Sequence, residues 1–185
     1  MRGKTNPFPS SEFALLGLLF ERPTHGYDLH RLVNDPQGIG MIWGVKMSNL
    51  YAQLDKLEKK GFITGIIRPP DSRPAKTEYH ITDEGKNIFV EWLKTIVKHP
   101  RDFRQEFMLR YFFILKFEPH KAKDFCAMQH QESSTWFANT VQSNQQWVTE
   151  SGFKKSILEF RVSQIRSMVD WLEWLQAQSP EISKI

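Results

Sequence analysis

The chain has 185 residues, of which 40% are hydrophobic and 13% aromatic, and this composition excludes a disordered or fibrous protein. The length is enough for one good-sized domain or two small ones. The net charge of +4 permits a polyanionic partner without requiring one. Residues 1–98 hold 14 basic and 11 acidic side chains, whereas residues 99–185 hold 11 and 10. The N-terminal half is therefore the better candidate for binding a polyanion.

The chain has one cysteine, Cys126, so it can form neither an internal disulfide nor a cysteine-rich metal site. Its longest apolar run, residues 13–20, is too short to span a bilayer and lacks the cleavage site of a signal peptide. Residues 1–10 form a flexible leader in this interpretation. We expect a soluble, cytoplasmic protein.

The first helix is expected to open at Ser11 and to be buried, because residues 13–20 are apolar nearly all round. A second helix should begin at Thr24 as its N-cap and run to about Asn34. Its expected inward side chains are Tyr27, Leu29, Leu32 and Val33. Residues 34–40 read as a loop, and residues 41–45 leave room for a very short strand.

Residues 46–62 predict a third helix with two distinct faces. Leucines recur on one side, with Ser48 as the expected N-cap and Gly61 as the left-handed residue after the end. Amide donors and cations on the other side suit base edges and phosphates, but any solvated helix can look the same. The leucines are Leu50, Leu54 and Leu57, and the polar face carries Asn49, Gln53, Lys56 and Lys60.

Residues 62–68 and 76–81 are rich in β-branched and aromatic side chains, and turn residues separate them, so we expect a hairpin. Thr82 should cap a further helix that closes near His99. Three helices, a two-stranded wing and a fourth helix are the layout of a winged helix-turn-helix domain. Its third helix would enter the major groove, with the basic wing residues on flanking phosphates. These wing residues are Arg68, Arg73 and Lys76.

Four ordered motifs carry a family resemblance: FALLGLL at 13–19, THGYDL at 24–29, SNLYAQLDKLEKKGFI at 48–63 and RPAKTEYHITDEG at 73–85. Together they resemble the PadR family of bacterial transcriptional regulators, and the second half is similar to its longer-tailed members. That group includes phenolic-acid-responsive repressors and a virulence-gene activator. The wing tip, residues 69–75, is less basic than many wings of the family.

The resemblance implies a homodimer that dimerises through its C-terminal helices and binds double-stranded DNA at an inverted-repeat operator. For Tyr51, which stands at the motif tyrosine, both base contact and packing beside the leucines stay open. The DNA-binding candidates on and before the third helix are Lys46, Ser48, Asn49, Tyr51, Gln53 and Lys56.

The second half should be all-helical. We expect helices over residues 103–117, from Pro119 to about Glu150, and after a break at residues 151–152. The last helix repeats apolar residues at alternating intervals of four and three, a seam that can pack within its own chain or, as we favour, form the dimer. The seam residues are Leu158, Val162, Ile165, Val169 and Leu172.

Trp136 and Trp147 suggest a pocket for a small aromatic effector, although tryptophans at helical spacing also serve as core or interface. We expect no cofactor, no metal and no enzymatic activity, because no catalytic motif is present. The predicted fold is mainly α, with a winged helix-turn-helix domain over residues 11–98 and an α-helical dimerisation domain over residues 99–185. Two alternatives stay open: a winged-helix module that binds protein instead of DNA, and a small-molecule-binding enzyme or carrier.

Overall fold

The computed structural model describes residues 10–68, 76–145 and 152–178. The chain forms two compact units. The first comprises Met1–Thr95 with Arg104–Phe112, and the second comprises Ile96–Phe103 with Phe113–Ile185. Both are mainly helical, as predicted, and the described residues add one small antiparallel sheet in the first unit.

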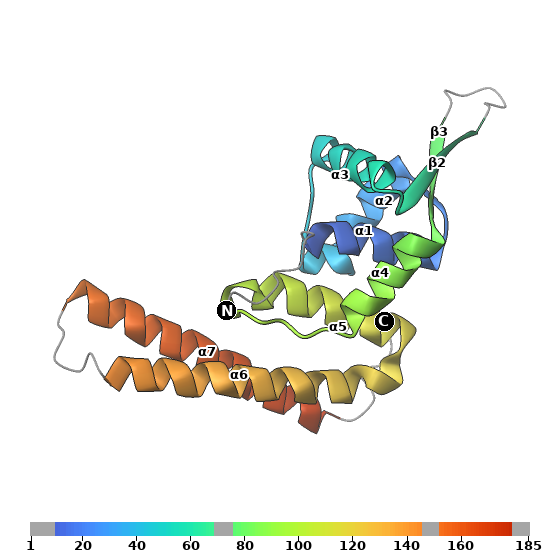
Figure 1. Ribbon diagram of the computed structural model, residues 1–185. Coiled ribbons are helices and arrows are strands. Elements are labelled where there is room, and N and C mark those ends of the chain that lie inside the picture. The colour runs from blue at the N-terminus through green and yellow to red at the C-terminus, as the bar shows by residue number, and fades with distance from the viewer. Residues whose placement is uncertain (1–9, 69–75, 146–151, 179–185) are drawn as a thin grey trace. The chain divides into compact units, whose positions relative to one another are not determined.

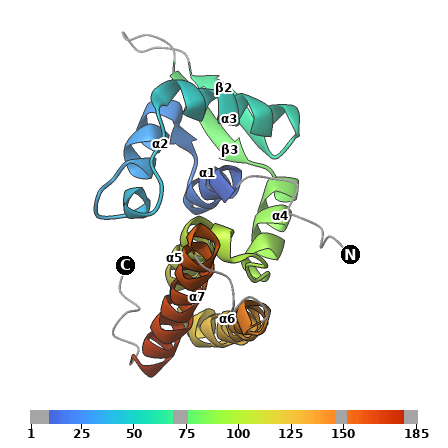
Figure 2. The same cartoon turned by 90° about the vertical axis from the view of Figure 1, so that its left-hand side faces the viewer.

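The first unit is built around α1 (Ser10–Glu21), which contacts α2 (Gly26–Val33), α3 (Met47–Lys59) and α4 (Asp83–Leu93) (Figures 1 and 2). Its apolar run is buried, as expected. Phe13 stacks on Trp92 of α4, with ring centroids 4.7 Å apart. The aromatic side chains of α4 thus pack on the helix that the sequence placed at the centre.

The sheet has three strands in the order β1-β3-β2, not the two that we predicted. β2 (Ile63–Arg68) and β3 (Lys76–Ile81) form the expected hairpin, and β1 (Thr24–His25) adds a short third strand with Thr24 opposite Tyr79. The predicted cap at Thr24 is therefore wrong. His25 is the residue that precedes α2, and the Thr24 hydroxyl donates to the carbonyl of Arg22 at 3.0 Å.

No strand forms over residues 41–45. The 3-10 turn η1 (Ile39–Met41) ends where this segment begins, and the Asn34 side chain forms hydrogen bonds with the backbone of Val45. Asn34 Nδ2 donates to the Val45 carbonyl and Asn34 Oδ1 accepts from the Val45 amide, each at 3.1 Å. An amide side chain replaces the strand partner that these backbone groups would otherwise need.

The C-terminal end of α3 is as predicted from the sequence, but its N-terminal end is not. Lys46, not Ser48, is the N-cap residue, and no side chain caps it. At the other end Gly61 has φ 76°, as predicted, and its amide bonds to Glu58 O at 2.9 Å while the Phe62 amide bonds to Leu57 O at 3.0 Å. These two bonds form a Schellman motif, which needs a left-handed residue at position 61.

Helix α4 begins as predicted, because the Thr82 side chain accepts from the Gly85 amide at 3.1 Å. It ends at Leu93, earlier than expected. Val97, which we placed on this helix, instead pairs its backbone with the Gln129 side chain in the second unit, at 2.8 Å and 3.1 Å. The chain therefore leaves α4 several residues before His99.

Residues 100–117 are helical throughout, but they are divided between the two units. The segment runs through the 3-10 turn η2 (Pro100–Asp102) and the π-helical turn η3 (Phe103–Phe107) into α5 (Met108–Phe117), which passes from the first unit to the second after Phe112. The boundary that we predicted at residue 98 differs from this division. Residues 104–112 join the first unit because Arg110 bonds to the end of α4.

The second unit is dominated by α6 (Ala122–Gln145) and α7 (Phe153–Ala177), which follow the short turn η4 (Pro119–Lys121) and lie side by side as an antiparallel pair (Figure 1). Three of the predicted seam residues, Val162, Ile165 and Leu172, are buried without any partner chain. Leu158 and Val169 are half-buried. No helix in the described part of the chain is long and apolar enough to cross a membrane.

Candidate nucleic-acid interface

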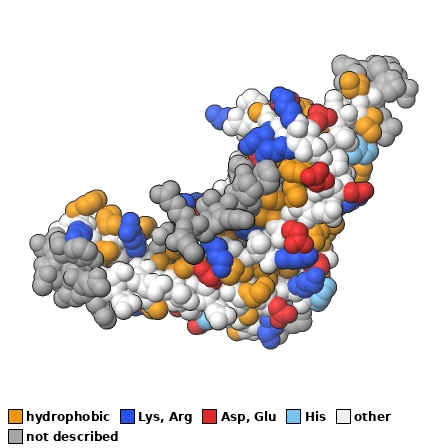
Figure 3. All heavy atoms as spheres, viewed as in Figure 1, with side chains coloured by type: hydrophobic (Ala, Val, Ile, Leu, Met, Phe, Trp, Pro, Cys, Tyr) orange, Lys and Arg blue, Asp and Glu red, His pale blue; other side chains and the backbone are white. Residues whose placement is uncertain are grey.

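The first turns of α3 present polar side chains to solvent. Ser48 and Asn49 are exposed, and so is Lys46 just before the helix. Tyr51 is 43% exposed. On the opposite side Leu50, Leu54 and Leu57 are buried, as predicted. Lysine and arginine side chains gather over this helix (Figure 3).

Lys46 occupies an electrostatically unfavourable place. The N-terminal end of a helix carries partial positive charge from its unpaired amides, and serine, threonine or aspartate would normally cap them. Here a cation stands at that position, and its side chain makes no capping hydrogen bond. An anion bound at this end of α3 would remove the conflict.

The two lysines of the predicted polar face pair with a carboxylate of α1. Lys56 Nζ lies 2.5 Å from Glu12 Oε1, and Lys60 Nζ lies 2.9 Å from Glu12 Oε2. Gln53 is half-buried, and its Oε1 has no partner among the described residues. Beyond Ser48 the outward stripe of α3 instead carries Ala52, Asp55 and Lys59.

Asp55 and Lys59 pair with each other at 2.7 Å, and both are well exposed. Lys59 thus has a carboxylate partner on its own helix, as an exposed pair four residues apart often does. The beginning of α3, with Lys46, Ser48 and Asn49, is an exposed polar region with no ion pair among the described residues.

The Tyr51 ring lies over Gly26, the first residue of α2. A Cβ added to Gly26 would stand 2.7 Å from Tyr51 Cε1. Tyr51 therefore packs against the backbone of α2 while keeping part of its surface in solvent. Both interpretations from the sequence apply in part: the ring is a packing element, and its exposed side remains accessible.

The wing is fixed to α3 at its base. Glu58 of α3 accepts a hydrogen bond from the Gly65 amide of β2 at 2.6 Å. Lys76, at the outer end of β3, is exposed and lies opposite Arg68 in the strand register. Arg73, and the side chain of Arg68, lie outside the described residues.

Tyr79 of β3 lies opposite Gly65 in the strand register. Burial raises the pKa of its hydroxyl above the ordinary value, and the nearby Glu58, Tyr51 and Asp55 raise it further. The phenol stays protonated beside the carboxylates of α3 across the neutral pH range.

Glu12 and Arg110 are the two buried charged side chains among the described residues, and neither is among the predicted site residues. Glu12 had a recognisable signal: a carboxylate at the start of a nearly all-apolar helix, with two lysines one turn apart on a later helix. Arg110 had a weaker signal, a lone cation within the densest apolar segment.

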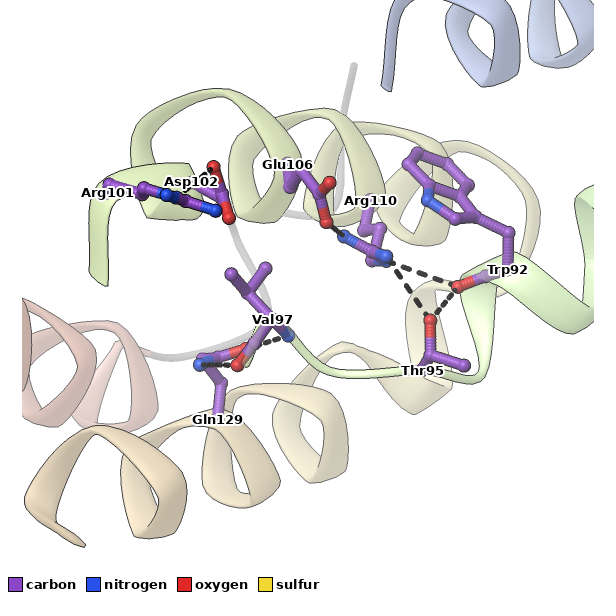
Figure 4. Close-up of polar contacts among 8 residues, drawn as sticks. All are labelled: Trp92, Thr95, Val97, Arg101, Asp102, Glu106, Arg110 and Gln129. Carbon is purple, nitrogen blue, oxygen red and sulfur yellow. Dashed lines mark hydrogen bonds and ion pairs between the residues drawn. The ribbon is translucent and has the colours of Figure 1, made fainter. Parts of the chain in front are cut away.

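Arg110 joins α5 to the end of α4 within the first unit (Figure 4). It pairs with Glu106 at 2.8 Å and donates to the Trp92 carbonyl and the Thr95 hydroxyl, each at 3.2 Å. Its guanidinium lies 4.5 Å from the centre of the Trp92 ring. Burial lowers the pKa of Arg110, and its contact with Glu106 opposes that shift.

Trp136, a predicted effector-site residue, is largely buried, and its indole nitrogen donates to Glu132 on the same helix at 3.2 Å. Trp147 lies outside the described residues. A groove of about 540 Å³ lies elsewhere in the second unit and is not lined by Trp136. Its lining combines polar and cationic side chains with two apolar ones: His99, Pro100, Arg101, Thr140, Arg161, Gln164 and Ile165.

No group of three His, Cys, Asp or Glu side chains in the described ranges could hold a metal ion. A helical triad with a β-hairpin beside its third helix, and an accessible polar turn on that helix, defines a winged helix-turn-helix protein of the nucleic-acid-binding class.

Comparison with known proteins gives the family. Residues 15–91 match the transcriptional regulator PadR-like family. The negative transcriptional regulator PadR of Bacillus subtilis (strain 168) is 31% identical over 134 residues, which cover 72% of this chain and 66% of that protein, slightly less than two thirds of its length. Residues 15–91 of the chain therefore belong to the PadR-like family of transcriptional regulators.

Solved structures with similar folds include that of Bacillus subtilis PadR in complex with operator DNA, with 26% identity, coverage of 93% of this chain and 98% of that chain, and a TM-score of 0.48. The same protein in complex with p-coumaric acid has 26% identity, coverage of 91% and 98%, and a TM-score of 0.42. The Vibrio cholerae virulence activator AphA has 18% identity, coverage of 90% and 95%, and a TM-score of 0.40.

Proposed function

We propose that this chain regulates transcription in the cytoplasm by binding an inverted-repeat operator as a homodimer. The observation that carries the proposal is the exposed first turn of α3, where Ser48 and Asn49 follow the uncapped cation Lys46. Family membership supplies the context in which such a surface meets DNA.

The chemistry of this turn suits a major groove. An asparagine amide can donate to and accept from the edge of adenine, and a serine hydroxyl can bond to any base. We assign base contact to Ser48 and Asn49, with the exposed edge of Tyr51 beside them, and phosphate contact to Lys46. We leave out Gln53 and Lys56, which the sequence also suggested, because Gln53 is half-buried and Lys56 pairs with Glu12 of α1.

The wing would contribute sequence-independent contacts. Lys76 is exposed at the beginning of β3. We propose that it contacts phosphate together with Arg68 and Arg73, the other basic wing residues predicted from the sequence. Phosphate contacts of this kind position a protein on the duplex and carry no sequence information.

We place the dimer contact on a surface other than the predicted seam, because three of the five seam residues are buried within their own chain. Helix α7 has a second apolar stripe, on which Phe153 and Phe160 are seven residues apart and Trp174 lies fourteen further on. Their side chains are 81%, 62% and 51% exposed. Hydrophobic side chains gather over the beginning of α7 (Figure 3). We assign the dimer contact to this stripe, because large exposed aromatics typically mark an interface.

A small effector would fit the groove in the second unit better than the tryptophans. The Bacillus subtilis relative has been crystallised with p-coumaric acid, an aromatic carboxylate. Arg101 and Arg161 line the groove here and could pair with a carboxylate. Binding of p-coumarate, measured by calorimetry and abolished by Arg161→Gln, would support this assignment.

Footprinting on the DNA upstream of the chain's own gene tests the main proposal. A dimer should protect two half-sites separated by one helical turn, about 34–36 Å, or by a multiple of it. Fluorescence anisotropy should then show that Asn49→Ala weakens operator binding by about 1–3 kcal/mol. Asn139→Ala changes an exposed amide of α6 and serves as the matched control. Affinity that is independent of salt, or absent, would favour the protein-binding alternative.

The dimer has its own test. Phe160→Ser should shift the mass measured by light scattering from dimer toward monomer, whereas Met128→Ser, at an exposed residue of α6, should not. A Phe160→Ser variant that stays fully dimeric at low concentration would place the interface elsewhere.

A further inference from the structure

Glu12 of α1 pairs with two lysines of the α3 region. It lies in the first turn of α1 and is only 2% exposed, and each oxygen of its carboxylate meets a different lysine of the α3 region. Lys56 and Lys60 are one helical turn apart, so one carboxylate reaches both ammonium groups. Their side chains keep 51% and 28% of their surface exposed.

This arrangement has little value for stability alone. A buried carboxylate carries a large desolvation cost, and replacing a buried ion pair by apolar side chains of similar size is often neutral or stabilising. An apolar residue at position 12 would continue the apolar run of α1. Packing alone therefore does not explain a carboxylate at position 12.

The ion pairs of the lysines in this region suggest a role for the Glu12 carboxylate. Lys59 pairs with Asp55, and Lys56 and Lys60 pair with Glu12. Within the described ranges, Lys46 is the one lysine between residues 46 and 60 that forms no ion pair. Among the lysines at positions 46 to 60, the one left available to phosphate therefore lies at the end of α3 that carries Ser48 and Asn49.

We propose that Glu12 is a positioning residue that suppresses sequence-independent DNA binding by holding Lys56 and Lys60 against the protein. The inference rests on the proposed function. Sequence-independent affinity comes from cations that neutralise phosphates and release counterions, and each such cation adds about 0.9 to the slope of log affinity against log salt. A carboxylate that keeps two ammonium groups engaged lowers that contribution, so base contacts decide a larger share of the binding free energy.

The test compares the full-length wild type with Glu12→Gln, which keeps the shape of the side chain and removes its charge. Binding to the operator and to a random duplex of equal length is measured by anisotropy over a salt series. Glu12→Gln should steepen the slope of log affinity against log salt by about 0.9 for each lysine released. For each such lysine, affinity should then gain about an extra threefold when salt falls from about 200 to about 50 mM. Affinity for the random duplex should rise more than affinity for the operator.

Glu91→Gln is the matched control, since it makes the same charge change on α4, where Glu91 pairs with Lys94. It should leave the slope unchanged. Adding Lys56→Gln and Lys60→Gln to Glu12→Gln should abolish the gain. A wild type that binds DNA and a Glu12→Gln variant with an unchanged slope would overturn the role of Glu12, while a wild type without salt-dependent DNA binding would overturn the proposed function itself.

Lys56→Gln gives a second test that does not depend on the folding of Glu12→Gln, because Lys60 still pairs with the carboxylate. If Glu12 holds Lys56 away from phosphate, this variant keeps the wild-type slope, whereas Lys46→Gln lowers it by about 0.9. A loss of the same size in Lys56→Gln would overturn the inference. A fall in melting temperature with no change in slope for Glu12→Gln would show a purely structural role and overturn it as well.

Discussion

The Tyr51 ring lies directly on Gly26, so a Cβ at residue 26 would stand 2.7 Å from Tyr51 Cε1 and 2.8 Å from the tyrosine hydroxyl oxygen. The contact joins the first residue of α2 to the second turn of α3. These are the two helices whose relative placement sets how the polar turn of α3 meets DNA in the proposed complex. A glycine here permits an approach that any other residue would block.

Gly26→Ala is therefore expected to displace the Tyr51 ring and to weaken operator binding more than it weakens the fold. The clash is with the far end of a side chain that can rotate, so the cost in unfolding free energy should be at the low end of the overpacking range, about 1 kcal/mol. Urea denaturation and anisotropy measure the two effects.

Tyr51→Ala supplies the control for that prediction, because it removes the obstructing ring. In this background Gly26→Ala should cost nothing, and the greater helix propensity of alanine should make it slightly stabilising. Equal costs of Gly26→Ala in both backgrounds would show that Tyr51 is not what the glycine accommodates.

Gly85 and Gly61 are predicted to differ in how they tolerate alanine. A Cβ on Gly85 would stand 2.1 Å from the Phe62 carbonyl oxygen, which is backbone and cannot move aside, so Gly85→Ala should cost about 3 kcal/mol or more. Gly61 has open space around it and is constrained only by its φ of 76°. Gly61→Ala should cost about 1–2 kcal/mol, and Gly61→Asn less. Chemical denaturation of the three variants tests this order.

The sequence predicted most of the fold, because its signals were local. The apolar run of α1, the leucine spacing of α3, Gly61 and the Thr82 cap are each visible within a few residues. The strand at residues 24–25 was missed because two residues with no alternating pattern form it, and its partner Tyr79 is more than fifty residues away.

The candidate site was less predictable, because its details depend on contacts between distant residues. Helical spacing grouped Asn49 with Lys56, but it could not show that a carboxylate on α1 faces the second half of that stripe. The same limit applies to α7. Three residues of its heptad seam are buried, and α7 packs against α6 of the same chain. Periodicity alone does not identify which helix covers such a seam.

Tyr79 predicts an alkaline loss of stability. Its pKa in the folded protein is raised, first by burial and then by Glu58, Tyr51 and Asp55, whereas in the unfolded chain it is about 10. The folded state therefore binds the phenolic proton more tightly. This contribution is fully present below about pH 10 and is lost as the pH rises through the folded-state pKa.

Tyr79→Phe should remove that part of the pH dependence. As the pH rises above about 10, the wild type should lose unfolding free energy faster than the variant, as measured by urea denaturation at each pH. Lysines also titrate in this range, but both proteins share them, so the difference between the two curves isolates Tyr79. Parallel curves would contradict the assignment.

Arg110 and Glu106 should be strongly coupled. Arg110 is buried, holds the Trp92 carbonyl and the Thr95 hydroxyl at the end of α4, and has Glu106 as its partner at 2.8 Å. Glu106→Leu would leave the guanidinium buried without a carboxylate, which should cost about 3 kcal/mol, the low end of the usual range because Glu106 is 21% exposed. Arg110→Met removes the buried charge but also its bonds to α4.

Combining the two changes should therefore cost less than the sum of the single changes, because the double variant buries neither an unpaired cation nor an unpaired carboxylate. A double-mutant cycle by urea denaturation, followed with the fluorescence of the tryptophans, measures the coupling. Lys94→Met breaks the exposed Lys94–Glu91 pair in the same unit and should cost less than about 1 kcal/mol. Additive costs for Arg110→Met and Glu106→Leu would mean that Arg110 acts through Trp92 and Thr95 alone, and that Glu106 does not support its burial.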